Sequence, residues 1–319
     1  KIRHGVTILA TGATEYRGED YLLGEDPRVL TLLDLERKIS ENLDELKRLK
    51  DIVFIQCVGP VGKKWYCSRI CCTTAIKNAL KIKEINPEAN VFILYKDVRT
   101  YGFKEKYYTQ AREKGIIFIR CSEANQPSLA VKDGDLWIKV KEPSLNQDLL
   151  ISPDLLVLTT ALVPSEGAEE LASLLKVPQS EEGFFLEAHV KLRPVDICVD
   201  GIFLCGMAHY PKFIDESIVQ ALAVAGRAAT VLSKKKLEVG GVIAAVEEDG
   251  CAVCLTCLRV CPYGAPFINE KGVAQIEVAK CQGCGICAAE CPAKVIQLLH
   301  YRDEEIMVEV DALFAEAKK

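Results

Sequence analysis

Eight cysteines near the carboxyl end of the chain repeat one spacing twice. Each run reads C-x2-C-x2-C-x3-C-P and ends in a proline, which offers no backbone donor. This spacing is the ligand pattern for two [4Fe–4S] clusters, in which the fourth cysteine of each run binds the other cluster. It predicts one cluster on Cys251, Cys254, Cys257 and Cys291, and a second on Cys281, Cys284, Cys287 and Cys261.

Zinc and disulfides are the alternatives for these thiols. Paired C-x2-C motifs also bind zinc, but a zinc site needs only four ligands. Zinc therefore leaves the third cysteine and the C-x3-C-P ending of each run without a purpose. The doubled run favours iron–sulfur clusters.

A second group of thiols lies much earlier, at Cys57, Cys67, Cys71 and Cys72. Four thiolates suffice for a third [4Fe–4S] cluster, and a helix that begins near Cys71 favours an anionic centre. A redox-active dithiol is the second interpretation, because thiols at a helix start have a lowered pKa. Ordinary buried thiols are the third. A disulfide between the adjacent Cys71 and Cys72 is disfavoured by strain.

Composition restricts the class of protein. The 319 residues suffice for two domains, and 49% hydrophobic with 27% charged residues describes a globular protein. A net charge of −5 gives no electrostatic case for nucleic acid or an anionic membrane. Fifteen cysteines fit a reducing compartment if metals bind most of them, and no apolar stretch reaches the ~20 residues of a membrane span. We therefore expect a cytoplasmic protein, and the first residue, Lys1, suggests a fragment or a processed chain.

Strands that alternate with helices are needed to position the earlier thiols. Apolar runs predict strands at 5–12, 52–57, 91–95, 116–120, 155–160 and 201–206. Helical patterns occupy 28–50, 70–85, 104–114, 167–175 and 214–232, and a hairpin is expected at 129–132 and 136–141. This order predicts right-handed βαβ units and a parallel sheet. We expect an α/β domain over 1–236, with a βαβ unit at 51–125, and an α+β ferredoxin domain of the bacterial 2[4Fe–4S] type over 237–319.

The first domain resembles flavoproteins of the thioredoxin reductase and glutathione reductase type, which have two dinucleotide-binding domains. The resemblance rests on a strand ending in A-T-G, on D-L-L-V-L-T-T-A-L-V-P at 154–164, and on D-G-I-F-L-C-G at 200–206 before a long helix. It implies FAD, because a helix start can stabilise negative charge on a reduced flavin. The implied flavin contacts are Thr11, Gly12, Gly206, Met207, Ala208 and His209. For Gly206 a plain strand-to-helix turn, and for His209 a surface position, are the alternatives.

The chain departs from that family in three respects. It contains no G-x-G-x-x-G loop for the FAD pyrophosphate, and Met207 stands where the family has aspartate. After the strand at 52–57, Trp65, Tyr66 and the thiols occupy the turn where a nicotinamide nucleotide needs close backbone approach. Binding of NAD(P) in the usual mode is therefore disfavoured.

A more specific resemblance covers nearly the whole chain. The stretches F-I-Q-C-V-G, Y-C-S-R-I-C-C-T-T-A-I-K-N-A, Y-K-D-V-R-T-Y-G-F and M-A-H-Y-P-K-F-I-D-E-S-I-V-Q-A-L-A look like the A-type component of heterodisulfide reductases. The resemblance implies FAD, a third cluster on Cys57, Cys67, Cys71 and Cys72, and a catalytic Lys77 near flavin N5. It also implies electron bifurcation in a complex. The implied partners are B- and C-type subunits, a hydrogenase, formate dehydrogenase or NADH-linked donor subunit, soluble ferredoxin and a second copy of the chain.

Other functions and roles stay open from the sequence. The chain could be a ferredoxin-type electron relay or scaffold without flavin, or a thiol–disulfide oxidoreductase that uses Cys71 or Cys72. Lys77 could be a solvated helix lysine. Cys121, Cys198 and Cys205 lie in or beside strands and are predicted to be core thiols. The loop at 99–102 follows a strand and is either a former phosphate site or plain loop.

Overall fold

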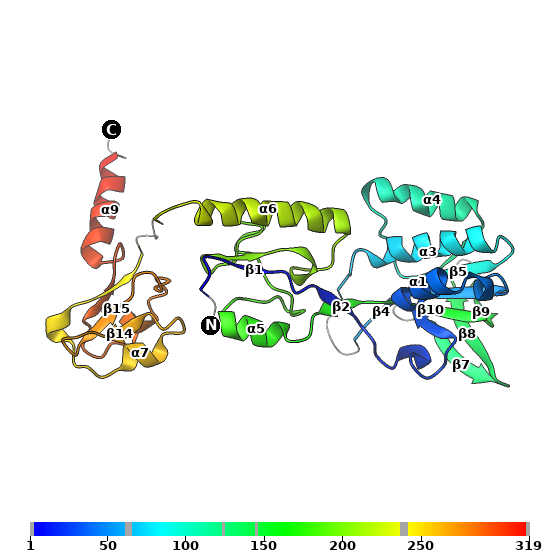
Figure 1. The fold of residues 1–319 in the computed structure, drawn as a ribbon, viewed down its shortest axis with the longest axis horizontal. Helices are drawn as coiled ribbons and strands as arrows, with labels where there is room; N and C mark the ends of the chain where they lie inside the picture. The colour runs from blue at the N-terminus through cyan, green and yellow to red at the C-terminus, as the bar shows by residue number, and fades with distance from the viewer. Residues whose placement is uncertain (1–2, 61–65, 123–124, 144–145, 237–241, 317–319) are drawn as a thin grey trace.

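The computed structural model describes residues 3–60, 66–122, 125–143, 146–236 and 242–316. Figure 1 shows three lobes, which we call the sheet lobe (described residues within 16–161), the middle lobe (3–15 and 162–236) and the end lobe (242–316). The chain leaves the middle lobe, builds the sheet lobe, and returns.

The sheet lobe is built on a five-stranded parallel sheet with the order β3-β10-β4-β5-β6. Its strands are β3 (Val29–Thr31), β10 (Leu155–Thr160), β4 (Asp51–Val58), β5 (Asn90–Tyr95) and β6 (Ile117–Arg120). The two central strands, β4 and β10, are almost entirely buried and rich in Val, Ile and Leu, as expected of a parallel sheet covered on both faces.

Each face of this sheet has its own cover. One face packs on α1 (Leu32–Glu41), α2 (Leu43–Leu46), α3 (Cys71–Ile85) and α4 (Glu105–Glu113), and the other on an antiparallel sheet of β7 (Ser128–Lys132), β8 (Asp135–Glu142) and β9 (Gln147–Ile151). Because side chains alternate along a strand, Phe54 enters the helix-side core and Ile55 the opposite one. The α/β prediction with a parallel sheet is confirmed.

Two local predictions in the sheet lobe need correction. The helix expected at 28–50 begins only at Leu32, because Val29–Thr31 pairs with β10 as an edge strand. Thr31 then starts α1 as its N-cap, in a capping box with Asp34. The expected hairpin has a third strand, β9, which pairs with β8.

The middle lobe has two small sheets between two helices. β1 (Thr7–Leu9) pairs in parallel with β12 (Ile202–Leu204), and β2 (Ala13–Glu15) pairs antiparallel with β11 (Leu162–Pro164). Figure 1 shows α6 (Ile214–Leu232) and α5 (Ala168–Leu175) on opposite sides of β1. The strand β11 follows β10 directly and thus ties this lobe to the central sheet.

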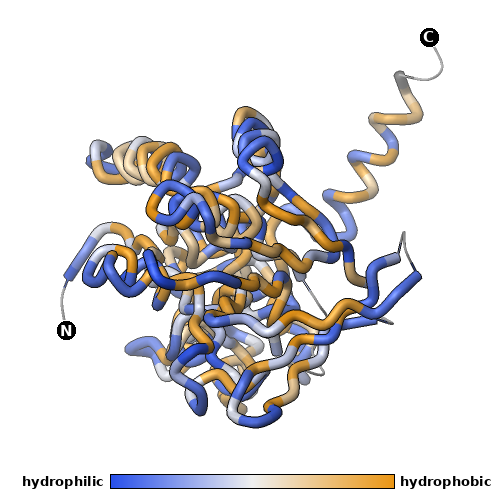
Figure 2. The backbone as a smooth tube through the Cα atoms, turned by 90° about the vertical axis from the view of Figure 1, so that its right-hand side faces the viewer, coloured by the Kyte–Doolittle hydropathy of each residue, from blue (hydrophilic) through white to orange (hydrophobic). Residues whose placement is uncertain are grey.

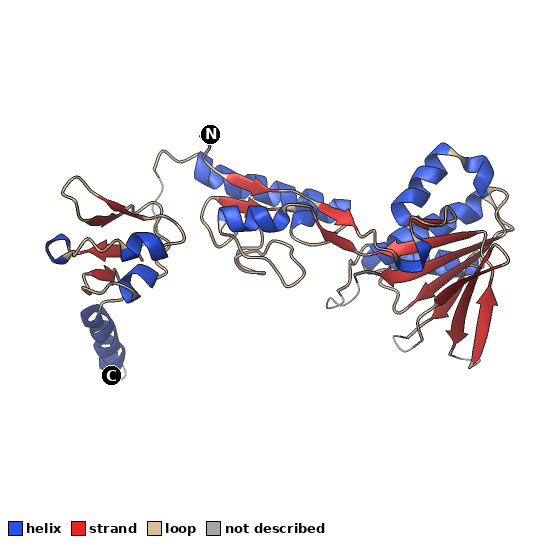
Figure 3. Cartoon of the chain, turned by 90° about the horizontal axis from the view of Figure 1, so that it is seen from below, coloured by secondary structure: helices blue, strands red, loops and turns tan. Residues whose placement is uncertain are grey.

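The end lobe is made of short elements and lies at the opposite end of the molecule from the larger sheet in Figure 3. β13 (Ala244–Val246) pairs with β16 (Ile296–Leu298), and β14 (Pro266–Ile268) pairs with β15 (Ala274–Ile276). In the sequence, the short helix α7 (Thr256–Val260) lies between β13 and β14, and α8 (Ile286–Ala289) lies between β15 and β16. The buried core of this lobe includes Cys257, Cys287 and Cys291. Cysteines therefore supply much of its interior.

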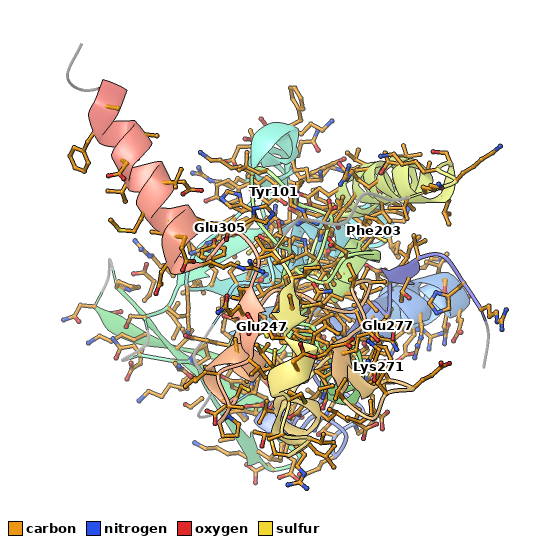
Figure 4. The ribbon with its side chains drawn as sticks, turned by 90° about the vertical axis from the view of Figure 1, so that its left-hand side faces the viewer. Tyr101, Phe203, Glu247, Lys271, Glu277 and Glu305 are labelled. Atoms are coloured by element: carbon orange, nitrogen blue, oxygen red, sulfur yellow. The ribbon has the colours of Figure 1, made fainter. Side chains whose placement is uncertain are left out.

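The last helix, α9 (Asp303–Glu316), extends from the end lobe and alternates apolar and polar stretches in Figure 2. Figure 4 views the molecule from the side of the end lobe and labels Glu247 and Glu277 of that lobe, together with Glu305 of α9. Among the helices of the described residues, none has the length and apolar character needed to cross a bilayer.

Candidate functional site

The first predicted ligand of the earlier thiol group, Cys57, lies at the carboxyl end of β4. Its φ of 62° is left-handed, which is unusual for a residue other than glycine and changes the direction of the side chain at the strand end. Burial first, and then the nearby thiols of Cys72 and Cys67, raise the pKa of Cys57 to about 12. The thiol is thus half-buried and beside two of its predicted partners.

Cys71 and Cys72 form the first residues of α3, as the sequence predicted for this helix. Both are buried, and a hydrogen bond between the two thiols raises the pKa of Cys71 and lowers that of Cys72 to about 7. The Cys72 thiol also lies 3.6 Å from the carbonyl oxygen of Asp97. The electrostatic neighbours of Cys71 include Cys57 and Cys67, so the structure brings all four predicted thiols together.

Cys67 lies on the loop before α3, and β11 anchors that loop. The Ser68 hydroxyl accepts a hydrogen bond of 2.9 Å from the Leu162 amide, and the Tyr66 hydroxyl donates to the Leu162 carbonyl. The Arg69 amide donates to the Cys67 sulfur at 3.3 Å. Residues 61–65, which include the bulky Trp65 of the sequence argument, lie outside the described part of the chain.

The four thiols line one cavity of about 360 Å³ at the carboxyl ends of the parallel strands, where α/β sheets generally bind ligands. Among the described residues, no three Cys, His, Asp or Glu side chains approach closely enough to hold a single metal ion. A [4Fe–4S] cube does not need that, because each thiolate binds a different iron at a separate corner. Thiols that meet at a helix start around a cavity fit the donor set of a cluster.

The predicted flavin residues gather at the neighbouring end of the middle lobe. Thr11 and Gly12 follow β1, and Gly206 follows β12, so both turns lie at the same edge of this parallel pair. Gly12 and Gly206 have φ values of 76° and 67°, which favour glycine. Met207 and Ala208 continue in a short 3-10 turn.

The long helix that the sequence predicts at 214–232 is confirmed as α6. The helix α6 begins at Ile214, because a 3-10 turn and a loop separate it from the strand. The Gly206 amide donates to the Gln220 side chain at 2.9 Å. The Gly206 amide is therefore bonded to α6 itself.

A buried polar cluster surrounds His209. Its Nε2 atom lies 2.7 Å from Glu187, and its Nδ1 atom lies 3.0 Å from Gln220 and 3.4 Å from the Lys212 ammonium. Burial first, and then Lys212, lower the pKa of His209 against the opposing effect of Glu187. Lys212 is only 5% exposed, and burial lowers its pKa to about 8. Sequence reasoning gave no role to Lys212, although it lies in the stretch M-A-H-Y-P-K-F.

A second cavity of about 330 Å³ lies beside His209. Its lining includes Tyr66, Cys67, Phe184, His209 and Tyr210. Tyr66 and Cys67 also line the thiol cavity, so they form the wall between the two spaces. The predicted cluster site and the His209 cluster thus lie on either side of one short loop.

Arg69 joins the same loop to α6. Its guanidinium bonds Glu216 at 2.8 Å and Tyr101 at 2.9 Å, and it stacks near the ring of Tyr210. The loop at 99–102, left open by the sequence, therefore contacts the middle lobe through Tyr101. Arg99 lines the thiol cavity.

The predicted catalytic residue Lys77 lies on the helix-covered surface of the sheet lobe. It is half exposed and pairs with Glu36 of α1 at 2.7 Å. It lines neither of the two cavities described above. Its contact with flavin stays a prediction.

The end lobe gathers its cysteines into two groups, each lining a small concavity. One group is Cys251, Cys254, Cys257 and Cys291, and the other is Cys261, Cys281, Cys284 and Cys287. These are the two exchanged sets that the repeated spacing predicts. The Ala244 amide donates to the Cys281 sulfur at 3.4 Å, a contact of the kind that tunes cluster sulfurs.

The remaining cysteines divide. Cys121 and Cys205 are buried, as predicted for core thiols, and Cys121 also lines the thiol cavity. Cys198 is exposed, so its prediction was wrong. It follows three consecutive buried residues, Val195, Asp196 and Ile197, in an irregular segment.

Comparisons with known proteins agree with this arrangement. The family described as "4Fe-4S dicluster domain" matches residues 244–292. The A component of the H(2):CoB-CoM heterodisulfide,ferredoxin reductase of Methanothermobacter thermautotrophicus is 36% identical over 343 residues, which cover 100% of this chain and 50% of that protein. An iron-sulfur A component of the CoB--CoM heterodisulfide reductase of Methanopyrus kandleri is 38% identical, and the match covers 99% of this chain and 51% of that protein.

The chain thus spans about half the length of these relatives. Among solved structures, the thioredoxin reductase of T. acidophilum is 18% identical with a TM-score of 0.47, covering 71% of this chain and 64% of that one. A likeness this partial does not bear on function.

Proposed function

Because the chain belongs to the HdrA-like family, the A-type components of heterodisulfide reductases, we propose that it is an oxidoreductase subunit that passes electrons between FAD and [4Fe–4S] clusters. Three clusters are proposed: two in the end lobe and one on Cys57, Cys67, Cys71 and Cys72. The flavin would lie at the turns after β1 and β12.

The observation that carries this proposal is the shared wall of the two cavities. Tyr66 and Cys67 face the thiol cavity on one side and the cavity beside His209 on the other. A cluster bound through Cys67 would then border the cavity that is also lined by His209, three residues after Gly206. Such closeness suits electron transfer between the cluster and the proposed flavin.

The cofactors supply complementary chemistry: a flavin exchanges one or two electrons and a cluster exchanges one. Residues of the chain itself fix the position of the Cys67 loop between the two proposed sites. Ser68 and Tyr66 fix the Cys67 loop to β11, and Arg69 fixes it to Glu216 of α6. The aromatic rings of Tyr66 and Phe184 meet edge to face with centroids 6.0 Å apart, and both residues line the second cavity.

The described residues fit one end of a FAD molecule. Two glycine turns, aromatic rings and the His209 cluster suit the flavin ring, whereas the sequence has no G-x-G-x-x-G loop for the pyrophosphate. The chain spans about half of its relatives, so we propose that full FAD binding requires further polypeptide. Bifurcation within a complex is likewise a proposal, with B- and C-type subunits, a donor subunit, ferredoxin and a second copy as partners.

Iron and flavin content test the proposal. The chain, purified without oxygen alone and together with the polypeptide that completes its relatives, is assayed for iron per chain, flavin absorbance and cluster EPR. We expect about twelve irons per chain, at four per cube, with FAD in the completed protein. Eight irons without flavin would support a relay instead, and eight irons with reactive thiols at Cys71 or Cys72 would support a thiol–disulfide oxidoreductase.

A further inference from the structure

Three buried polar side chains line the thiol cavity. Gln56, Thr159 and Thr160 are 5%, 0% and 4% exposed. Within the described part of the chain, the Gln56 Oε1 atom and both threonine hydroxyls lack a hydrogen-bond partner. Buried polar groups in proteins are nearly always bonded, so three orphans on one cavity wall need an explanation.

The strands that carry these residues are otherwise apolar. β4 reads Asp-Ile-Val-Phe-Ile before Gln56, and β10 reads Leu-Leu-Val-Leu before Thr159. Polar residues replace apolar ones only where the strands reach the cavity. A core that needed only packing would continue with Val or Ile at these positions.

The local backbone directs this wall toward the thiols. Gln56 directly precedes Cys57 on β4, and β10 is the neighbouring strand. The pairing of β10 with β4 shifts its register between Leu158 and Thr160, opposite Val58, and irregularities of this kind redirect side chains beside functional sites. The wall of Gln56, Thr159 and Thr160 therefore shares one cavity with Cys57, Cys67, Cys71 and Cys72.

We propose that Thr159 and Thr160 donate hydrogen bonds to sulfur atoms of the cluster held by these four cysteines, and that they raise its reduction potential. The hydroxyl is a donor that can rotate, and the sulfide and thiolate sulfurs are negatively charged acceptors. Hydrogen bonds to the sulfurs are one of the levers that set cluster potentials, because they stabilise the added electron. The orphan Oε1 atom of Gln56 is an acceptor, so the cluster sulfurs can satisfy only the two threonine hydroxyls. These are positioning and tuning residues, and the inference rests on the proposed third cluster.

The chain offers a matched control. Thr73 on α3 is also buried, at 7% exposure, and its hydroxyl also lacks a partner among the described residues, but it does not line the cavity. It directly follows Cys72, so its replacement by valine removes a hydroxyl near the cluster without removing one that faces it.

The test is an EPR-monitored redox titration of the full chain with its clusters. In the Thr159→Val/Thr160→Val protein we expect the ratio of reduced to oxidised third cluster at a fixed potential to fall about tenfold, a shift of about 59 mV for one electron. The end-lobe clusters are an internal reference and should not shift. Thr73→Val should leave all potentials unchanged, and Thr159→Ser/Thr160→Ser should retain the wild-type value.

Three outcomes separate this inference from the function it rests on. If the wild type holds only eight irons, the third cluster is absent and the proposed function itself fails. If it holds about twelve and the valine protein keeps the wild-type potential, only the hydrogen-bonding inference is overturned, and water satisfies the wall. If the valine protein loses the third cluster, the serine protein decides: it must keep the wild-type potential, and any shift there contradicts the proposal.

Discussion

The end lobe and the sheet lobe both gather cysteines, but they do so on different foundations. In the end lobe, Cys257, Cys287 and Cys291 belong to the small buried core. In the sheet lobe, Cys71 and Cys72 also belong to a buried core, but that core is larger and consists mostly of aliphatic side chains and Phe54. We infer that the end lobe needs bound metal in order to fold. The sheet lobe, in contrast, folds without metal and holds the thiols in place beforehand.

Replacing one ligand in each lobe gives the largest expected effect. Cys291→Ala should remove iron from the end lobe and unfold it, because that cysteine is both a proposed ligand and a buried core residue. Cys67→Ala should remove about four irons but leave the sheet lobe folded. Iron analysis, with hydrogen exchange to follow each lobe, measures both. The exposed Cys198→Ala is the control and should lose no iron. Equal unfolding of both lobes would break the comparison.

A substitution in the core of the sheet lobe tests the same difference between the two lobes. Phe54 is fully buried in β4, so Phe54→Ala should destabilise the sheet lobe by about 3–5 kcal/mol. The end lobe should not respond. Urea unfolding followed by circular dichroism and hydrogen exchange measures the loss. Phe103→Ala, at a side chain that is 96% exposed, should change stability by less than about 0.5 kcal/mol.

The same difference explains what the sequence could predict. The end-lobe cysteines are separated by two or three residues within each run, so their spacing alone groups them. Cys57, Cys67, Cys71 and Cys72 could be counted and placed at a strand end and helix start. The opposite wall at Thr159 and Thr160 could not, because the pairing of β10 with β4 joins residues about a hundred positions apart. A signal did exist, since two threonines end an otherwise apolar strand.

Lys212 and Arg69 were missed for a related reason. Nothing in the sequence distinguishes either residue from other cations. The role of Arg69 becomes visible only where the sheet lobe contacts the middle lobe and Arg69 pairs with Glu216. The late start of α1 was missed because Val29–Thr31 has both helical spacing and strand composition, and only pairing with β10 decides between them.

The His209 cluster predicts a pH dependence in the middle lobe. Burial and Lys212 hold the pKa of His209 below its usual 6.5, so the unfolded chain binds more protons than the folded chain around that pH. The stabilisation is complete above pH 6.5 and is lost as the pH falls toward the lower folded value. Glu187 and Gln220, which also face the ring, remain in place. Urea unfolding of the middle lobe between pH 7.5 and 5.5 should show this slope.

Two histidine variants test whether the pH dependence of unfolding arises in the middle lobe. His209→Gln should flatten the pH dependence of unfolding between these limits, because no proton then binds at this position. His300→Gln, at an exposed residue of the end lobe, should leave the slope unchanged. A slope that survives His209→Gln would mean that another group, and not this buried histidine, couples folding to protons.

The smallest expected effect concerns Lys77. Its replacement distinguishes the surface position seen in the structure from the catalytic role that the family resemblance implies. The pair that Lys77 makes with Glu36 is exposed, and such pairs contribute only about 0–1 kcal/mol. Lys77→Gln should therefore change stability no more than Lys81→Gln, whose exposed partner is Glu84. A catalytic lysine near flavin N5 requires a different result: in the completed flavin-containing protein, Lys77→Gln alone would shift the flavin potential. If both variants leave that potential unchanged, the lysine belongs to the helix surface, and the Cys67 loop remains the link between the two cavities.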